Sequence, residues 1–401
     1  MAASIPASVN PPLLVWAREE SGFALEPIAK RLNVKPERLL AWERGEAKPS
    51  VRQTQALARF YHRPFGLFFL PQLPALPPLA AEYRRLPGVR PGVESPELRL
   101  ALRVMSERRE LILELSEELG LAVTEFRTPV HLSEGAQEVG RRLRSLLGVS
   151  TPEQLGWRDE WQAWRRWREA VESVGVLVFQ FPKVALDQAR GVSLLRFPLP
   201  VIGVNSKEGA PGARIFTLLH ELTHVALALG RDEKSALQEP RSDAAWSKVE
   251  RFAEEAASAT LIPEETFAEC LKRLSVARDR WDVERVRKLA AKFRVTPLAM
   301  ATRLRAAGAL SWEGYRRWKQ AWAKYLAGLK PPPGGFAAPV DKTLGRGGRP
   351  FTQLVIEALD ANRITVVEAC QYLDLRFEHF DKLRTKLRDG PPSGRVMDDG
   401  D

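Results

Sequence analysis

The segment Phe216-Thr-Leu-Leu-His-Glu-Leu-Thr-His-Val-Ala-Leu227 carries two histidines four residues apart, with a glutamate directly after the first. The run is apolar and favours helix, so its spacing predicts a helix from which His220 and His224 project on one face. Two imidazoles on one face can hold a single metal ion, and Glu221 lies beside them, where it can polarise a metal-bound water. The segment therefore predicts a zinc site of the hydrolase type.

A hydrolytic zinc site needs a third protein ligand and keeps one coordination position open for water. The best candidate is Glu250, which lies in a run, residues 246–263, that reads as a helix stopped by proline. Ala253 and Ala257 share one side with Glu250 and would let this helix approach the metal-binding helix closely. Acidic residues of the intervening segment rank lower, because that segment contains proline and reads as an irregular loop: Asp232, Glu233, Glu239 and Asp243.

Glu254 follows Glu250 by one helical turn and is expected to hydrogen-bond a ligating histidine from outside the coordination sphere. Zinc is the expected metal, although manganese or iron also suits two imidazoles and one carboxylate. The alternative is a purely structural helix. We favour the metal site, because the chain has only five histidines and a chance match to this spacing is rare.

Residues from about 175 to 263 resemble the ImmA/IrrE metallopeptidases. The matching features are the Phe-Thr-Leu-x-His-Glu-x-x-His run at 216–224, the later Glu250, Ala253 and Ala257, and the closing Leu261-Ile-Pro263. The chain departs from the family pattern at Glu254, where asparagine is usual, and at Ala256, where phenylalanine is usual.

This resemblance implies a zincin-like peptidase fold, with His220, His224 and Glu250 as zinc ligands and Glu221 as general base. It also implies a narrow substrate range, often transcriptional repressors with a helix-turn-helix fold. Three short β-branched runs precede the metal-binding helix and predict a small sheet: 176–181, 192–195 and 201–205. An edge strand can bind an extended substrate, and the run ending at Asn205 is a candidate, although covering the helix is the simpler role.

Residues 10–70 divide into four helical stretches, 13–21, 25–32, 36–43 and 51–61. They resemble the Xre-type helix-turn-helix of phage repressors, which implies an all-α N-terminal domain. The matching residues are Ala17-Arg-Glu-Glu-Ser-Gly22, Ile28-Ala29, Leu32, Trp42-Glu-Arg-Gly45, Pro49 and Leu57-Ala58.

The stretch 36–43 takes the place of the recognition helix in this resemblance. Arg38 could contact guanine, and four further basic residues could contact phosphates: Lys35, Arg44, Lys48 and Arg52. The same side chains equally suit a solvated basic face. The module could therefore bind nucleic acid, recognise the protein substrate or form a homodimer.

The rest of the chain divides by composition. A proline-rich connector is expected at 71–94, where Tyr83-Arg-Arg-Leu-Pro87 resembles connectors that join an Xre module to this peptidase. Residues 95–174 read as helical, and the peptidase core with its helical tail extends over 175–325. A flexible linker is expected at 326–350, which is rich in glycine and proline, followed by a helical C-terminal module at 351–390. The expected fold is thus mainly α with a small sheet (α+β).

Four tryptophans, at 157, 161, 164 and 167, are expected on one helix face, where buried packing is the default and base stacking the alternative. The net charge of +11 over 401 residues favours contact with nucleic acid or an acidic partner. Two cysteines cannot make a disulfide framework, and no signal segment or membrane-spanning run is evident, so a cytoplasmic location and no membrane partner are expected.

These features together predict a regulatory zinc endopeptidase that cleaves a repressor or antitoxin-like partner in a stress, phage or mobile-element response. One alternative is a DNA-binding regulator whose peptidase domain only senses a ligand. Another is an antitoxin-like interaction protein with structural zinc. Structural zinc normally has four protein ligands and only three are evident, which favours the enzyme.

Overall fold

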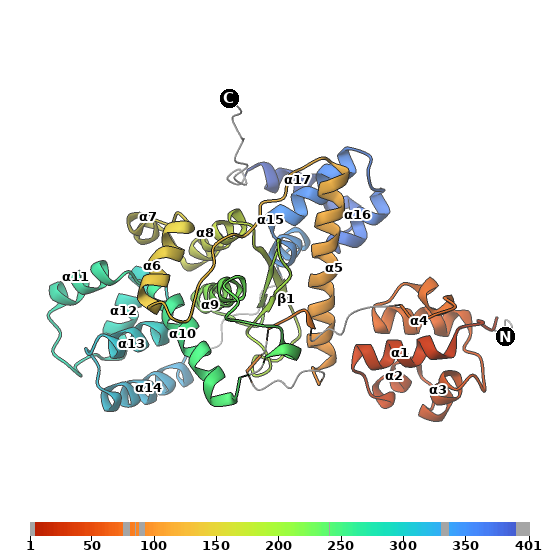
Figure 1. The fold of residues 1–401 in the computed structure, drawn as a ribbon, viewed down its shortest axis with the longest axis horizontal. Coiled ribbons are helices and arrows are strands. Elements are labelled where there is room, and N and C mark those ends of the chain that lie inside the picture. Colours follow the sequence, from red (N-terminus) through yellow and green to blue (C-terminus); the bar gives the residue numbers. More distant parts are fainter. Residues whose placement is uncertain are drawn as a thin grey trace.

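The computed structural model describes residues 5–74, 81–84, 86–87, 93–239, 241–329 and 337–389. It is mainly helical with one three-stranded sheet, so the predicted fold class is confirmed (Figure 1). A small N-terminal lobe lies beside the long helix α5 (Pro96–Glu118), and the other elements surround the sheet. No helix in these ranges is long and apolar enough to cross a membrane.

The N-terminal lobe consists of α1 (Pro11–Ser21), α2 (Leu25–Leu32), α3 (Pro36–Glu43), α4 (Val51–Tyr61) and the short 3-10 helix η1 (Phe65–Phe69). The four helices match the predicted stretches closely, since proline or Ser50 begins three of them and left-handed residues end most. Leu13, Ile28 and Trp42 belong to its buried core. Arg18 of α1 forms an ion pair with Glu43 of α3, in which Arg18 Nε donates to Glu43 Oε1 at 2.8 Å.

The sheet contains β1 (Leu177–Phe181), β2 (Gly191–Leu194) and β3 (Val201–Asn205) in the order β1-β3-β2. β1 runs parallel to β3, and β2 runs antiparallel to it. Alternate residues face two different cores: Val178 and Ile202 pack with α9 (Pro211–Leu229), whereas Phe179 and Val201 share a core with residues of α5 and α15 (Pro339–Asp360). Burial on both faces explains the apolar strands. β3 is central, so the run ending at Asn205 is not the candidate edge strand, and its simpler role of covering the helix holds.

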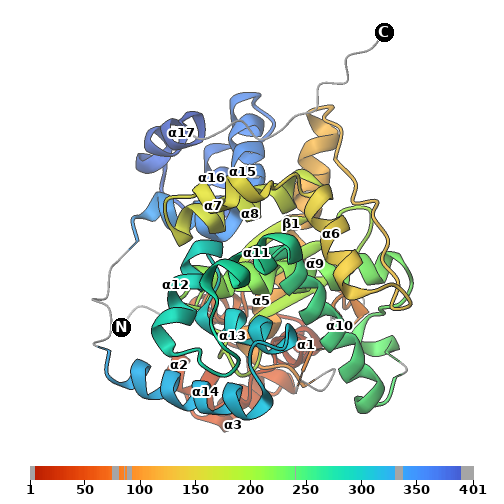
Figure 2. The same ribbon diagram turned by 90° about the vertical axis from the view of Figure 1, so that its left-hand side faces the viewer.

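The helix α9 runs through the interior, with α8 (Glu160–Ser173) and α10 (Asp243–Leu261) against it. Figure 2 shows the helices α11 to α14 grouped on one side of the molecule and α15 to α17 on another. The remaining helices are α6 (Ala136–Leu146), α7 (Thr151–Gly156), η3 (Ala236–Gln238), α11 (Glu264–Leu274), α12 (Val283–Phe293), α13 (Pro297–Ala306), α14 (Trp312–Ala327), α16 (Val366–Leu373), η4 (Phe377–His379) and α17 (Phe380–Arg388).

The tryptophan-rich segment forms two helices, so its four tryptophans do not lie on one face of a single helix. The chain breaks between α7 and α8, and Asp159 caps α8 by accepting from the backbone of Gln162. Trp157, Trp164 and Trp167 are buried as expected, but Trp161 is 47% exposed, with the guanidinium of Arg214 over its ring. The expectation of one buried stripe is therefore wrong for Trp161.

The expected linker at 326–350 is also wrong over most of the part that is described. Helix α14 continues to Ala327, and α15 begins at Pro339 and includes the glycine-rich run, while residues 330–336 lie outside the described ranges. Gly348 kinks α15 with a φ of 76° and lies against the buried ion pair of Arg168 and Glu172. At Gly348 the glycine allows a left-handed turn and a close approach to side chains of α8.

Replacing Gly348 with alanine should lower the free energy of unfolding by about 2–4 kcal/mol, because a left-handed φ and an overpacked contact each destabilise. A Cβ at this position would lie 2.5 Å from Glu172 Oε1 and 2.6 Å from Arg168 Nη2. Gly345→Ala is the matched control, since its Cβ would meet only Gln180 Oε1 at 3.8 Å. Urea unfolding followed by circular dichroism measures both variants, and equal effects would restore the flexible-linker interpretation.

Candidate metal centre

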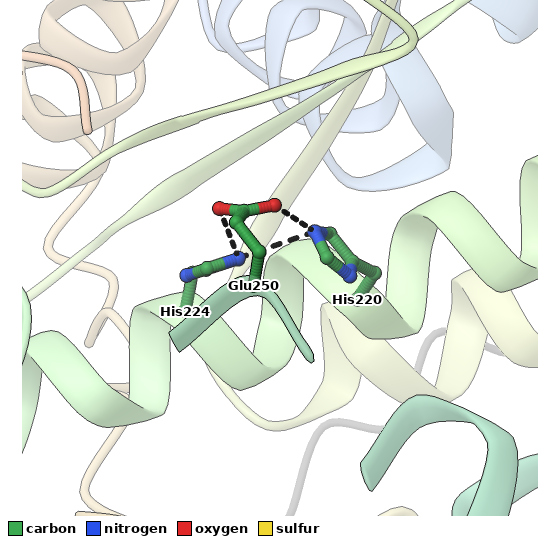
Figure 3. Close-up of side chains that lie close together, drawn as sticks. All are labelled: His220, His224 and Glu250. Atoms are coloured by element: carbon green, nitrogen blue, oxygen red, sulfur yellow. Dashed lines mark hydrogen bonds and ion pairs between the residues drawn. The ribbon is translucent and has the colours of Figure 1, made fainter. Parts of the chain in front are cut away.

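Two crossing helices bring the three predicted metal ligands to one point (Figure 3). His220 and His224 stand on successive turns of α9, and their Nε2 atoms are 3.1 Å apart. Glu250 reaches them from α10, with Oε2 3.3 Å from His220 Nε2 and Oε1 3.2 Å from His224 Nε2. Ala253 and Ala257 on α10 are fully buried, and their small side chains allow the two helices to pack closely.

The geometry of these donors fits one divalent ion. Zinc is bound at about 2.0–2.1 Å in a tetrahedral arrangement, which places neighbouring ligand atoms about 3.3 Å apart. The three observed separations, 3.1, 3.2 and 3.3 Å, agree with that value. His224 is fully buried, whereas the side chains of His220 and Glu250 are 13% and 16% exposed, so the site faces solvent on their side.

Glu233 orients one of the two predicted histidine ligands. Its Oε2 lies 2.8 Å from His224 Nδ1, and a proton on Nδ1 leaves the Nε2 lone pair directed toward Glu250 and His220. Glu233 is 3% exposed and lies in the turn that follows α9. It is one of the loop carboxylates that the sequence ranked low as ligands.

The role predicted for Glu254 is therefore wrong. Its side chain is exposed, and no described contact joins it to either histidine. Residues four apart on a helix are offset by only about 40°, so the spacing puts Glu254 near Glu250, but Glu254 lies on the edge of that face that is turned to solvent. The alanines Ala253 and Ala257 occupy the buried side instead.

Arg84 of the connector lies within the site, a contact that was not predicted from the sequence. Its Nε and Nη2 donate to the two carboxylate oxygens of Glu221 at 2.9 and 2.7 Å, and its Nη1 donates to Glu250 Oε1 at 2.9 Å. Ser193 of β2 donates a further hydrogen bond to Glu221 Oε2 at 2.5 Å. Arg84 and Glu221 are each 2% exposed. The only signal in the sequence was the family-like Tyr83-Arg-Arg connector.

The protonation of the site follows from these contacts. Burial alone would raise the pKa of Glu221, but the charge and hydrogen bonds of Arg84 lower it to about 2. The pKa of Glu250 is lowered further, again because Arg84 and the histidines outweigh burial. Burial and Arg84 disfavour the cationic form of His224, yet hydrogen bonds to Glu233 and Glu250 raise its pKa to about 9. Both carboxylates are thus held ionised.

The five candidate DNA contacts lie together in the N-terminal lobe, outside the metal centre. All are exposed, and they lie on α3, at its two ends, in the loop that follows it or at the start of α4: Lys35, Arg38, Arg44, Lys48 and Arg52. Lys48 donates to Ser8 Oγ, and Arg44 lies 3.9 Å from Glu46, so these contacts are weak surface interactions. The arrangement leaves the basic side chains available to a ligand.

Replacing Glu233 with alanine is expected to weaken metal binding by about 10–100-fold, because His224 would lose the partner that orients its ring. Glu254→Ala is the matched control and should leave the affinity unchanged, since Glu254 is exposed. Competition with a chelating dye measures both affinities. If both variants lost metal affinity equally, Glu233 would not be the residue that orients His224.

Comparison with known families agrees with this geometry. Residues 171–305 match the family model of the IrrE N-terminal-like domain, the peptidase M78 family, and this range contains the sheet, α9 and α10. Residues 14–68 match the helix-turn-helix family model. No match to the chain was found among curated proteins. The predicted resemblance is confirmed: the chain is similar to a fusion of an N-terminal helix-turn-helix module with a metallopeptidase-type domain of the peptidase M78 family.

Proposed function

We propose that this protein is a zinc-dependent endopeptidase that cleaves a specific protein partner. The observation that carries the proposal is the convergence of His220, His224 and Glu250, with Glu221 on the same helix beside them. When bound there, a zinc ion would activate water and polarise the scissile carbonyl. A divalent manganese or iron ion suits the same donors.

The side chains of the chain supply the rest of the chemistry. Glu221 is the general base: it takes the proton from the attacking water and passes it to the leaving amine. Its neighbour Ser193 fixes one carboxylate oxygen, and Glu233 fixes the ring of His224. Arg84 donates to both carboxylate oxygens of Glu221, so Glu221 must lose part of this contact before it can accept a proton.

The proposed substrate is a helix-turn-helix repressor or antitoxin-like protein, cleaved in a stress, phage or mobile-element response. The helix-turn-helix module within the same chain supports this, because a module of the same type as the proposed substrate offers a surface that can recognise it. A narrow substrate range also agrees with the buried position of Glu221.

Replacing Glu221 with glutamine should abolish cleavage and leave the metal bound, because the ligands remain while the general base is lost. His220→Ala should lose the metal as well as the activity. Glu255→Gln, an exposed change on α10, is the control. Co-expression with proteins encoded by neighbouring genes, mass spectrometry of fragments and metal analysis measure these effects. Cleavage that survives in Glu221→Gln would exclude the mechanism.

Nucleic acid binding by the N-terminal module is a second proposed function, supported by the exposed basic side chains around α3. Such contacts neutralise phosphates and release counterions, which makes affinity fall with salt. This function does not compete with proteolysis, because the basic residues lie outside the metal centre.

Replacing Lys35, Arg44 and Arg52 together by alanine should reduce the slope of log affinity against log salt by about 2–3 on duplex DNA. Arg59→Ala, an exposed change at the other end of α4, is the control and should keep the slope. Fluorescence anisotropy over a range of salt concentrations gives the slopes. An unchanged slope in the triple variant would assign the basic face to another ligand.

A further inference from the structure

The connector residues Glu82 to Arg84 lie along the outer edge of the sheet as an added strand. Arg84 N donates to Ser193 O at 3.1 Å, Leu195 N donates to Glu82 O at 2.9 Å, and Tyr83 pairs with Leu194 in an antiparallel bridge. On the other side, Ala236 N donates to Tyr83 O at 2.7 Å. The connector is therefore bonded on both sides, between β2 and the segment that follows α9.

This is the place where an extended peptide would add to the sheet. β2 is an outer strand in the order β1-β3-β2, and an extended peptide can bind such an edge through its backbone. β2 also lies next to the catalytic machinery, since its Ser193 contacts Glu221. A substrate strand paired with β2 would pass directly beside the general base, along the path that the connector now occupies.

The side chain of Arg84 also occupies the site itself. It donates a hydrogen bond to each carboxylate oxygen of Glu221, the group that must accept a proton. It also donates to Glu250, a predicted metal ligand. Bidentate pairing of arginine with a carboxylate is strong and directional. Because the pair is almost fully buried, water does not screen it. The connector thus provides both the backbone of a bound peptide and a cation on the general base.

A chain of contacts joins this strand to the helix-turn-helix module. The hydroxyl of Tyr83 donates to Glu94, and Glu94 pairs with Arg99 of α5, with an Nε–Oε2 distance of 3.4 Å. Arg99 in turn donates through Nη1 to the carbonyl of Glu19 near the end of α1, at 2.8 Å. Arg103 of α5 donates similarly to Tyr61 O, at the end of α4. Helix C-terminal carbonyls attract such cations.

We propose that residues 82–84 are an intramolecular inhibitor that occupies the peptide-binding edge and blocks Glu221, and that undocking of the helix-turn-helix module from α5 releases it. The proposal rests on the proposed peptidase function and adds its regulation. A ligand of the module, DNA or a protein partner, would activate the enzyme if its binding competes with the contacts of Arg99 and Arg103. The same module would then sense the signal and control access to the site.

The first test replaces Arg84 with alanine in the full-length, zinc-loaded protein. We expect Glu221-dependent cleavage of the partner to rise on the order of tenfold or more, as the open state becomes populated. The control is Arg109→Ala, which removes another buried arginine, one that donates to Leu199 O away from the metal centre. A fall in cleavage for Arg84→Ala, with zinc and fold retained, would instead make Arg84 a positioning residue and overturn the proposal.

A second readout does not depend on turnover. The Arg84 amide should exchange slowly with deuterium in the resting protein, because it donates to Ser193 O. Adding the zinc-binding tripeptide leucyl-glycyl-leucine hydroxamate should speed exchange at residues 82–84 if this strand and a peptide compete for β2. Unchanged exchange with the probe bound would overturn the proposal. If peptidase activity itself is absent, no variant cleaves, yet the exchange result still decides whether the strand is displaced.

The coupling to the module is tested with Arg99→Ala and Arg103→Ala, each of which removes one arginine of α5 that donates to the module. Both should raise cleavage and the exchange at residues 82–84, with Arg141→Ala on the exposed face of α6 as control. Adding Arg99→Ala to Arg84→Ala should give no further activation, because the two changes act on one step. Control by the module would be overturned if both docking variants kept the wild-type cleavage rate and the wild-type exchange at residues 82–84. It would also be overturned if the activations of the two single variants added in full in the double variant.

Discussion

The structure depends on the balance of charge around three carboxylates, the buried Glu221 and Glu233 and the partly buried Glu250. Carboxylates removed from water are tolerated only when cations or donors pair with them, and here the partners are Arg84 and His224, with His220 beside them. The packing of α9 against α10 and the pairing of the connector with β2 both serve this balance. The side chains that could hold a divalent cation are, in this conformation, paired with the guanidinium of Arg84.

This balance connects regions that are distant in the sequence. The proposed general base comes from α9, a proposed metal ligand from α10, the carboxylate that contacts His224 from the turn between them and the guanidinium from the connector. The connector is anchored through Glu94 and Arg99 to the end of α1. The helix-turn-helix module and the metallopeptidase domain are thus joined by polar contacts as well as by the chain, which provides a physical route for one to influence the other.

Much of the fold and the ligand set followed from local patterns. The four N-terminal helices and the three strands could be predicted because the spacing of apolar residues identifies each element, and proline, serine and glycine mark where it begins or ends. Glu254 was misassigned because spacing along a helix does not say which side is buried. The run around Gly348 was misread because glycine marks both free chain and close approach, and only the neighbouring Arg168 and Glu172 distinguish the two.

The sequence by itself determined which side chains can act: two histidines one turn apart, a glutamate beside them and a second glutamate on a helix with small neighbours, since helical periodicity fixes such relations. Only the tertiary structure decided what contacts them. Glu233 and Arg84 reach the site from a turn and a connector whose positions depend on long-range packing and strand pairing, which no local period encodes.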